Sequence, residues 1–270
     1  MLGDITIGQY FPGNSFLHKM DARMKIVLIL FLMISIFICK NYAALAIAVA
    51  VTVLLVGISR IKPSVILKGI KPILFILLFT TVLNLFYGTG EPLAKWWIFT
   101  ITVRGLNNAL FMGTRIILLV VIGLMLTYTT TPTALTDAIE SLLKPLKALG
   151  ADTHSLAMIM TIALRFIPIL IEEVEKIMAA QKSRGADMES GGLIKRAKAI
   201  VPILIPLFVS SFRRANELAD AMECRCYRGG EGRTKMKVMH LHTRDYLSMI
   251  FVILYFAGII ITRVLMGSVI

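Results

Sequence analysis

Five long apolar segments constrain the fold of this chain more than any other feature. They run over about residues 24–39, 42–58, 72–87, 106–128 and 246–265. A helix needs roughly 20 mainly apolar residues to cross a bilayer. The first segment is shorter than that, so its ends must extend or its flanking side chains must reach the interface. We therefore predict an all-α membrane protein with about five transmembrane helices.

Charged residues are rare in these segments, which contain only Lys25, Arg115 and Arg263. The 270-residue chain is 57% hydrophobic yet carries a formal net charge of +13. A basic balance that is concentrated in the connections is typical of membrane topology and does not indicate nucleic-acid binding. The three cysteines, Cys39, Cys224 and Cys226, do not suggest a disulfide framework.

Basic residues are frequent before the first segment and between the second and third, but the turn after the first has only Lys40. The positive-inside rule then predicts a cytoplasmic N-terminus and an external C-terminus. Residues 1–128 would form an N-terminal membrane domain of four spans, 129–244 a cytoplasmic coupling-helix region, and 245–270 a final transmembrane helix.

The stretch 129–244 is too long for a structureless loop, and its apolar residues recur with helical spacing. We expect a first amphipathic helix from Pro132 to Gly150 and a second from Asp152 to Gly185. A third is expected over about 193–214, with a last helix continuing to about 227. Pro168 predicts a kink in the second, and Pro202 with Pro206 predict that the third is kinked or split.

Two of these predicted helices end in a similar way. Segments 180–185 and 221–227 each hold an arginine between small residues, four positions after an alanine. Small neighbours would let a helix end enter a groove while Arg184 or Arg225 projects toward carboxylates. The alternative is that both arginines are solvated charges at helix ends, where a cation also suits the helix dipole.

The chain resembles the transmembrane T component of energy-coupling factor (ECF) transporters, the EcfT family. Residues 18–25 resemble the family's Leu-Asp-Pro-Arg-x-Lys segment, with departures at Met20 and Ala22. Residues 164–168 resemble its Arg-Phe-Ile-Pro segment. The two arginine ends resemble its paired Ala-Arg-Gly-like coupling motifs, although the second has cysteines at both flanks of its arginine.

The resemblance implies a non-catalytic scaffold in the cell membrane of a prokaryote. It would couple ATP hydrolysis by two cytoplasmic ABC-type ATPase subunits to uptake of a vitamin or metal ion through a membrane-embedded substrate-binding S component. It would bind no cofactor itself, because ATP is used by the partner subunits. The implied ATPase-coupling motifs are Ser183, Arg184, Gly185, Cys224, Arg225 and Cys226. Residues implied to support structure or coupling are Arg23, Arg165, Pro168, Gln181, Glu223 and Tyr227.

Other functions have weaker support in the sequence. No phosphate-binding Gly-x-x-x-x-Gly-Lys-Ser/Thr motif is present, and His240 with His242, or Cys224 with Cys226, lack the further ligands of a metal site. A self-contained permease remains an alternative, although the spans offer few polar residues beyond Asn84 and Arg115. Arg115 either makes an interior polar contact or extends to the interface. A membrane enzyme lacks a visible catalytic set, and the substrate is not identified.

Overall fold

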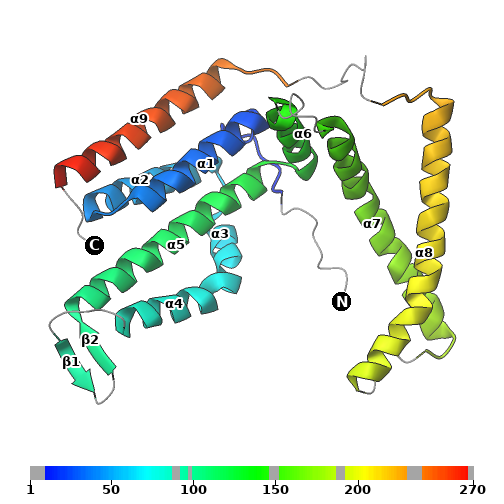
Figure 1. Ribbon diagram of the computed structural model, residues 1–270, viewed down its shortest axis with the longest axis horizontal. Coiled ribbons are helices and arrows are strands. Elements are labelled where there is room, and N and C mark those ends of the chain that lie inside the picture. Colours follow the sequence, from blue (N-terminus) through cyan, green and yellow to red (C-terminus); the bar gives the residue numbers. More distant parts are fainter. Residues whose placement is uncertain are drawn as a thin grey trace. The chain divides into compact units, whose positions relative to one another are not determined.

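A computed structural model describes residues 10–86, 92–96, 99–145, 152–186, 192–229 and 239–266 of the protein. The chain divides into two compact units, which we call the bundle unit and the two-helix unit. The bundle unit holds residues 10–138 and 239–266, and the two-helix unit holds the described residues from 139 to 229. Figure 1 labels their elements.

The bundle unit contains α1 (Ala22–Ile38), α2 (Tyr42–Ser59), α3 (Pro63–Ile70), η1 (Lys71–Ile73), α4 (Leu74–Phe86), β1 (Pro92–Trp96), β2 (Phe99–Thr102), α5 (Val103–Thr129) and α9 (Thr243–Met266). The two-helix unit contains α7 (Thr153–Ser183) and α8 (Leu193–Cys224). The boundary between the units falls inside α6 (Pro132–Leu143).

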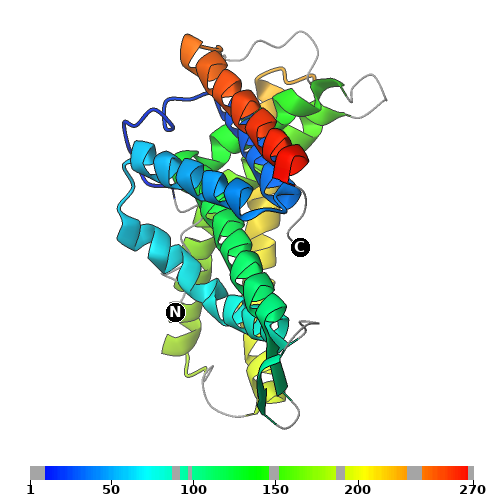
Figure 2. The same cartoon turned by 90° about the vertical axis from the view of Figure 1, so that its left-hand side faces the viewer.

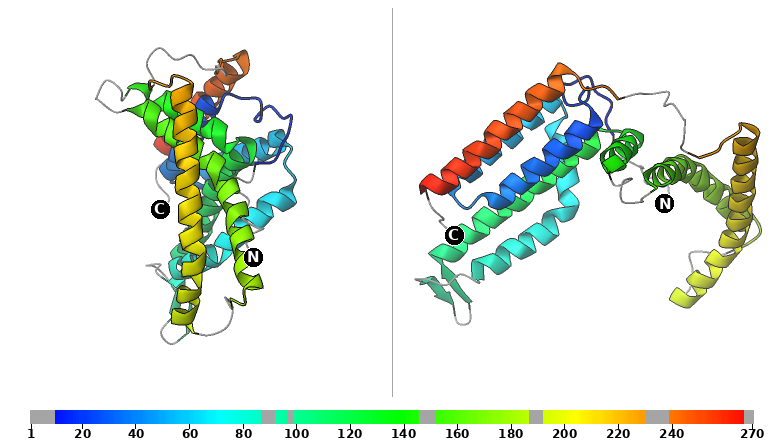
Figure 3. Two further views of the ribbon diagram at one scale, coloured as in Figure 1. Left: turned by 90° about the vertical axis from the view of Figure 1, so that its right-hand side faces the viewer. Right: turned by 45° about the horizontal axis from the view of Figure 1, so that its top comes forward.

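Helix α5 is the centre of the bundle unit, because α1, α2, α3 and α4 all pack against it. Helix α9 packs on α1 and α2, and Figure 3 (right) shows α9, α1, α5 and α4 side by side. Ile36, Phe111 and Ile259 are fully buried where these helices meet. The apolar segments predicted from the sequence are therefore confirmed as helices, and the protein is an α-helical membrane protein.

The third segment differs from the prediction in its detail. The chain from Pro63 to Phe86 forms α3, the short 3-10 turn η1 and α4. Pro63 starts α3, where its missing N–H is harmless, and Pro72 lies within η1, where it interrupts the α-helical hydrogen bonding.

A two-stranded antiparallel hairpin, β1–β2, connects α4 to α5, and the sequence analysis did not predict it (Figure 2). Residues 99–102, Phe-Thr-Ile-Thr, are β-branched or aromatic and therefore favour a strand. Each strand has too few residues to show the alternation of apolar and polar side chains by which a strand is recognised in a sequence, so the hairpin was missed.

Five helical stretches of the described residues are long and apolar enough to cross a membrane: Tyr42–Ser59, Pro63–Leu85, Val103–Thr129, Thr153–Ser183 and Thr243–Leu265. Four of these stretches match predicted spans and the fifth is α7, whereas the predicted first span, α1, has 17 residues. The sequence analysis placed α7 in the cytoplasm, within the coupling-helix region 129–244, yet residues 153–171 contain Arg165 as their only Lys, Arg, Asp or Glu.

Helix α8 is continuous through Pro202 and Pro206 as far as Cys224. Of the two predicted alternatives, a kinked or a split helix, the split is therefore wrong, and so is the separate last helix. Helix α7 likewise continues through Pro168. The predicted end of the first amphipathic helix, up to Gly150, lies outside the described residues.

Candidate functional site

The end of α7 is closed by a Schellman motif. Gly185 has a left-handed backbone with φ 83°, and its N–H donates to the Lys182 carbonyl at 3.0 Å. The N–H of Ala186 donates to the Gln181 carbonyl, also at 3.0 Å. These are the two hydrogen bonds that define this C-terminal cap. Arg184 is the C-cap residue, so its side chain leaves the helix where the chain turns away.

The end of α8 repeats this geometry residue for residue. Cys226 has φ 57°, and its N–H donates to the Glu223 carbonyl at 2.8 Å. The N–H of Tyr227 donates to the Met222 carbonyl at 3.0 Å, and Arg225 is the C-cap. The two arginine segments matched in the sequence thus have the same backbone conformation. They differ in the residue that adopts the left-handed conformation, which is glycine in one end and cysteine in the other.

Both C-cap arginines are exposed, as are Ser183, Gly185, Glu223, Cys224 and Cys226. Within the described residues, neither the Arg184 nor the Arg225 side chain has a hydrogen-bond or ion-pair partner. Tyr227, next to Cys226, is half-buried. Each end therefore carries an exposed guanidinium group flanked by small side chains.

The pairing of α7 with α8 fixes the two ends relative to one another (Figure 3, left). The Glu173 carboxylate accepts from Arg214 Nη2 at 2.9 Å and from the Ser210 hydroxyl at 3.3 Å. Gln181, three residues before Arg184, contacts Pro202. Because α8 continues from Pro202 to Arg225 at 1.5 Å per residue, the two arginines lie on the order of 35 Å apart along it.

The Gln181 contact also compensates α8 for a hydrogen bond that Pro206 removes. Pro206 has no N–H, so the carbonyl of Pro202, four residues earlier, lacks its helical donor. The Gln181 amide nitrogen supplies a donor to this carbonyl at 3.4 Å. Gln181, which the sequence analysis grouped with the supporting residues, therefore connects the α7 end to the proline-containing part of α8.

Arg23 lies in the bundle unit, where its hydrogen bonds connect the start of α1 to the segment before α9. Its guanidinium donates to the Asp21 carboxylate at 3.0 Å and to the Met239 carbonyl at 2.8 Å. The Asp245 carboxylate accepts from the backbone N–H groups of Asp21 and His242. Lys25, which the sequence analysis missed as a site residue, is buried and donates to Thr129 and Thr130 at the end of α5.

Comparisons with known proteins agree with the resemblance seen in the sequence. The family model CbiQ, described as cobalt transport protein, matches residues 13–236, which include both arginine ends. A protein of Ruminiclostridium cellulolyticum is 53% identical over 247 residues, covering 92% of both chains. One of Clostridium kluyveri is 48% identical over 270 residues, covering 99% of this chain and 100% of the relative. Both relatives are named energy-coupling factor transporter transmembrane protein EcfT.

The chain belongs to the EcfT family. It is thus a multi-pass membrane protein and the transmembrane component of an ECF transporter, which works as a complex with other components. The resemblance given by the sequence motifs is confirmed.

The remaining predicted residues of this EcfT protein are not part of the two helix ends. Arg165 and Pro168 are exposed in the middle of α7. Arg115 donates to the Cys39 carbonyl at the end of α1 and lies over the Phe111 ring, so it makes a polar contact within the bundle unit. At the start of α7, hydrogen bonds from Ser155 lower the pKa of Asp152, which caps this helix. The described residues contain no group of three or more metal-ligating side chains.

Proposed function

We propose that this EcfT protein is the scaffold of an ECF-type importer and couples ATP hydrolysis by two cytoplasmic ATPase subunits to substrate uptake through a membrane-embedded S component. The observation that carries the proposal is the pair of C-terminal helix ends with the same cap and an exposed, unpartnered arginine within the described residues. Two equivalent ends suit two similar binding grooves.

Each end would bind through its arginine and its small neighbours. The Arg184 and Arg225 guanidinium groups would pair with carboxylates in the ATPase grooves, and Ser183, Gly185, Cys224 and Cys226 would allow close approach of the backbone. The loss of one partner of a buried ion pair costs roughly 3–5 kcal/mol, enough to release or uncouple a subunit.

The pairing of α7 with α8 would transmit movement between the two ends. The Glu173–Arg214 ion pair and the Gln181–Pro202 hydrogen bond resist sliding of one helix along the other. A displacement of one ATPase would therefore move both helices, whose exposed apolar side chains, such as Phe208 and Phe212, would contact the S component. On this proposal the chain hydrolyses no ATP and needs no cofactor of its own.

The proposed topology places the basic end of the bundle unit in the cytoplasm of a prokaryotic cell. The starts of α1 and α9 meet the end of α5 there through Asp21, Asp245 and Lys25. Lys19, Arg60, Lys62 and Arg244 are exposed at this end. The positive-inside rule supports a cytoplasmic N-terminus with residues 129–244 on the same side, except where the apolar half of α7 enters the bilayer. The substrate, a vitamin or a metal ion, would be selected by the S component.

A self-contained permease would need a polar path through the bundle unit. In the described part of that unit, Arg115 of α5 donates to the Cys39 carbonyl and the buried Lys25 of α1 donates to Thr129 and Thr130, so both side chains are engaged within the protein. This observation favours the scaffold over the permease.

The test is co-purification of tagged protein from membranes that contain the other ECF components. Wild type should bring down two ATP-binding subunits and a small membrane protein, and Arg184→Ala with Arg225→Ala should lose the ATPases. Arg213→Ala is the matched control, because Arg213 is also exposed on α8 but lies away from its end. If wild type purifies alone and moves a solute in liposomes, the permease is correct.

A further inference from the structure

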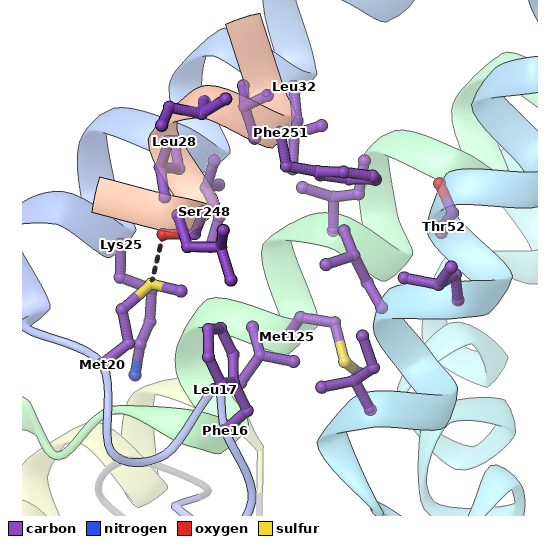
Figure 4. A pocket seen from close by; sticks show the side chains of 18 of the residues that line it. Phe16, Leu17, Met20, Lys25, Leu28, Leu32, Thr52, Met125, Ser248 and Phe251 are labelled. Carbon is purple, nitrogen blue, oxygen red and sulfur yellow. Dashed lines mark hydrogen bonds between the residues drawn. The ribbon is translucent and has the colours of Figure 1, made fainter. Parts of the chain in front are cut away.

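The bundle unit contains a cavity of about 530 Å³ between α1, α2, α5 and α9, shown in Figure 4. This volume falls within the range of roughly 300–1,000 Å³ that is usual for small-molecule sites. Leu28 and Leu32 of α1, Met125 of α5 and Phe251 of α9 form much of its wall. The cavity plays no part in the coupling proposed above.

The wall offers little to a polar ligand. Apart from apolar residues it contains Lys25, Thr52 and Ser248. The Lys25 ammonium donates to Thr129 and Thr130, the Thr52 hydroxyl to the Ala48 carbonyl, and the Ser248 hydroxyl to the Asp245 carbonyl. Because these groups are already bonded within the protein, a hydrocarbon chain is the ligand that suits the cavity.

The exposed residues of the cavity wall all belong to α2 and α9, so we infer that the cavity opens between these two helices. These helices are joined at one end, where the Asn41 amide donates to the Thr262 carbonyl at 3.2 Å. The lining residues lie toward their other ends, at Thr52–Ile58 and Leu247–Leu254. Leu247 and Leu254 at the rim are 64% and 67% exposed. Both stretches belong to candidate membrane spans, so the rim faces the hydrocarbon from which a chain can enter.

The basic side chains near this end of the cavity favour a lipid with an anionic headgroup. Lys19, Arg60 and Arg244 are exposed and lie within three residues along the chain of the lining residues Met20, Ile58 and Leu247. No ion pair is formed by these cations within the described part of the chain. The two nearby carboxylates, Asp21 and Asp245, are already occupied by Arg23 and by backbone N–H groups. An apolar cavity with basic side chains near its opening, at a membrane interface, is complementary to the acyl chain and the anionic headgroup of a lipid.

We propose that this cavity binds one acyl chain of an anionic phospholipid, whose phosphate is held by Arg60 and Arg244. The site is separate from the arginine ends of α7 and α8, and its occupancy does not depend on ATPase docking. A bound acyl chain would fill the cavity between α2 and α9 and stabilise the bundle unit.

The test is native mass spectrometry of the full-length chain in detergent, titrated with dioleoyl phosphatidylglycerol or with dioleoyl phosphatidylcholine, which has the same chains. Wild type should bind one phosphatidylglycerol with a preference of at least about tenfold, the effect of one charge-assisted hydrogen bond. The Arg60→Gln, Arg244→Gln double variant should lose the preference. Arg104→Gln, which removes an exposed arginine at the opposite end of α5, should keep it.

A second variant tests the cavity independently of charge. Leu254→Trp places a bulky ring at the exposed rim, where folding should tolerate it, and should weaken binding of both lipids. Equal binding of both lipids to wild type would overturn the proposal, as would unchanged binding to Leu254→Trp. Saturation by glycerol phosphate or inorganic phosphate alone would show a headgroup site without an acyl chain. Capture of another subunit, instead of lipid, by a photoreactive residue at position 254 in membranes would also contradict it.

Discussion

The ends of α7 and α8 have the same cap but reach it with different residues. Gly185 adopts the left-handed conformation at little cost, whereas Cys226 does so with a side chain. A residue with a Cβ loses about 1–2 kcal/mol in this conformation. The α8 end keeps its shape nonetheless, which indicates that the arginine position matters more than the residue after it. The two ends should therefore be equivalent in binding but unequal in stability.

The largest expected effect is on binding. Arg184→Glu and Arg225→Glu should each weaken ATPase association by roughly 3–5 kcal/mol, because each leaves a groove carboxylate unpaired and adds a like charge. Titration of purified ATPase subunits onto the protein in nanodiscs measures this. Similar losses of ATPase affinity in the two variants would support equivalent binding by the two ends. A loss in one variant alone would show that the ends are not equivalent.

A smaller effect is expected on the pairing that holds the ends apart. Glu173→Ala should destabilise the α7–α8 pair by about 1–3 kcal/mol, because Arg214 and Ser210 lose their acceptor. The thermal unfolding midpoint should fall. Glu172→Ala, which removes the exposed carboxylate next to it, should leave the midpoint unchanged. An equal shift in both variants would show that the ion pair does not stabilise the unit.

The third prediction exchanges the residues that distinguish the ends. Gly185→Ala should destabilise the α7 end by about 1–2 kcal/mol, and Cys226→Gly should stabilise the α8 end by about 1 kcal/mol. No atom lies within 4 Å of a Cβ built on Gly185, so only the backbone conformation is tested there. Hydrogen exchange of the Ala186 and Tyr227 amides reports each cap. A loss of cap stability in Gly185→Ala and a gain in Cys226→Gly would support the proposed difference between the two ends. A change of the same direction in both variants would contradict it.

The smallest effect concerns the long hydrogen bond to the Pro202 carbonyl. Gln181→Leu should cost about 0.5–1 kcal/mol in wild type, measured by chemical unfolding. In a Pro206→Ala background the helix supplies its own donor to that carbonyl, so the cost of Gln181→Leu should largely disappear. A cost that is independent of position 206 would mean that Gln181 acts in another way.

Much of this fold could be predicted from the sequence, because apolar runs and cap residues are local signals. Asp152 and Gly185 bound α7 as expected. The continuity of α8 could not be predicted, since the donor that compensates for Pro206 comes from Gln181 on another helix. The hairpin was missed because its strands are short, and the amphipathic second half of α7 concealed that its first half is apolar enough for a span.

In the candidate site, too, local features could be predicted from the sequence and contacts between distant residues could not. The matched arginines could be read from the sequence, and so could a glycine that closes α7. The left-handed conformation of Cys226 could not, because cysteine has no preference for it. The buried contacts of Lys25 and Asp245 join residues far apart in the chain, which a single sequence does not reveal.

The most direct measurement is crosslinking from each end in the assembled transporter. The starting protein is a Cys224→Ser, Cys226→Gly variant, in which the buried Cys39 is the remaining thiol. A single cysteine is then introduced at Ser183 or restored at position 224. With a short bifunctional reagent, each position should join to an ATP-binding subunit, and mass spectrometry should place both crosslinks in equivalent grooves. If either end stays uncrosslinked, or joins only to the S component, the two ends are not a matched pair of ATPase-docking sites.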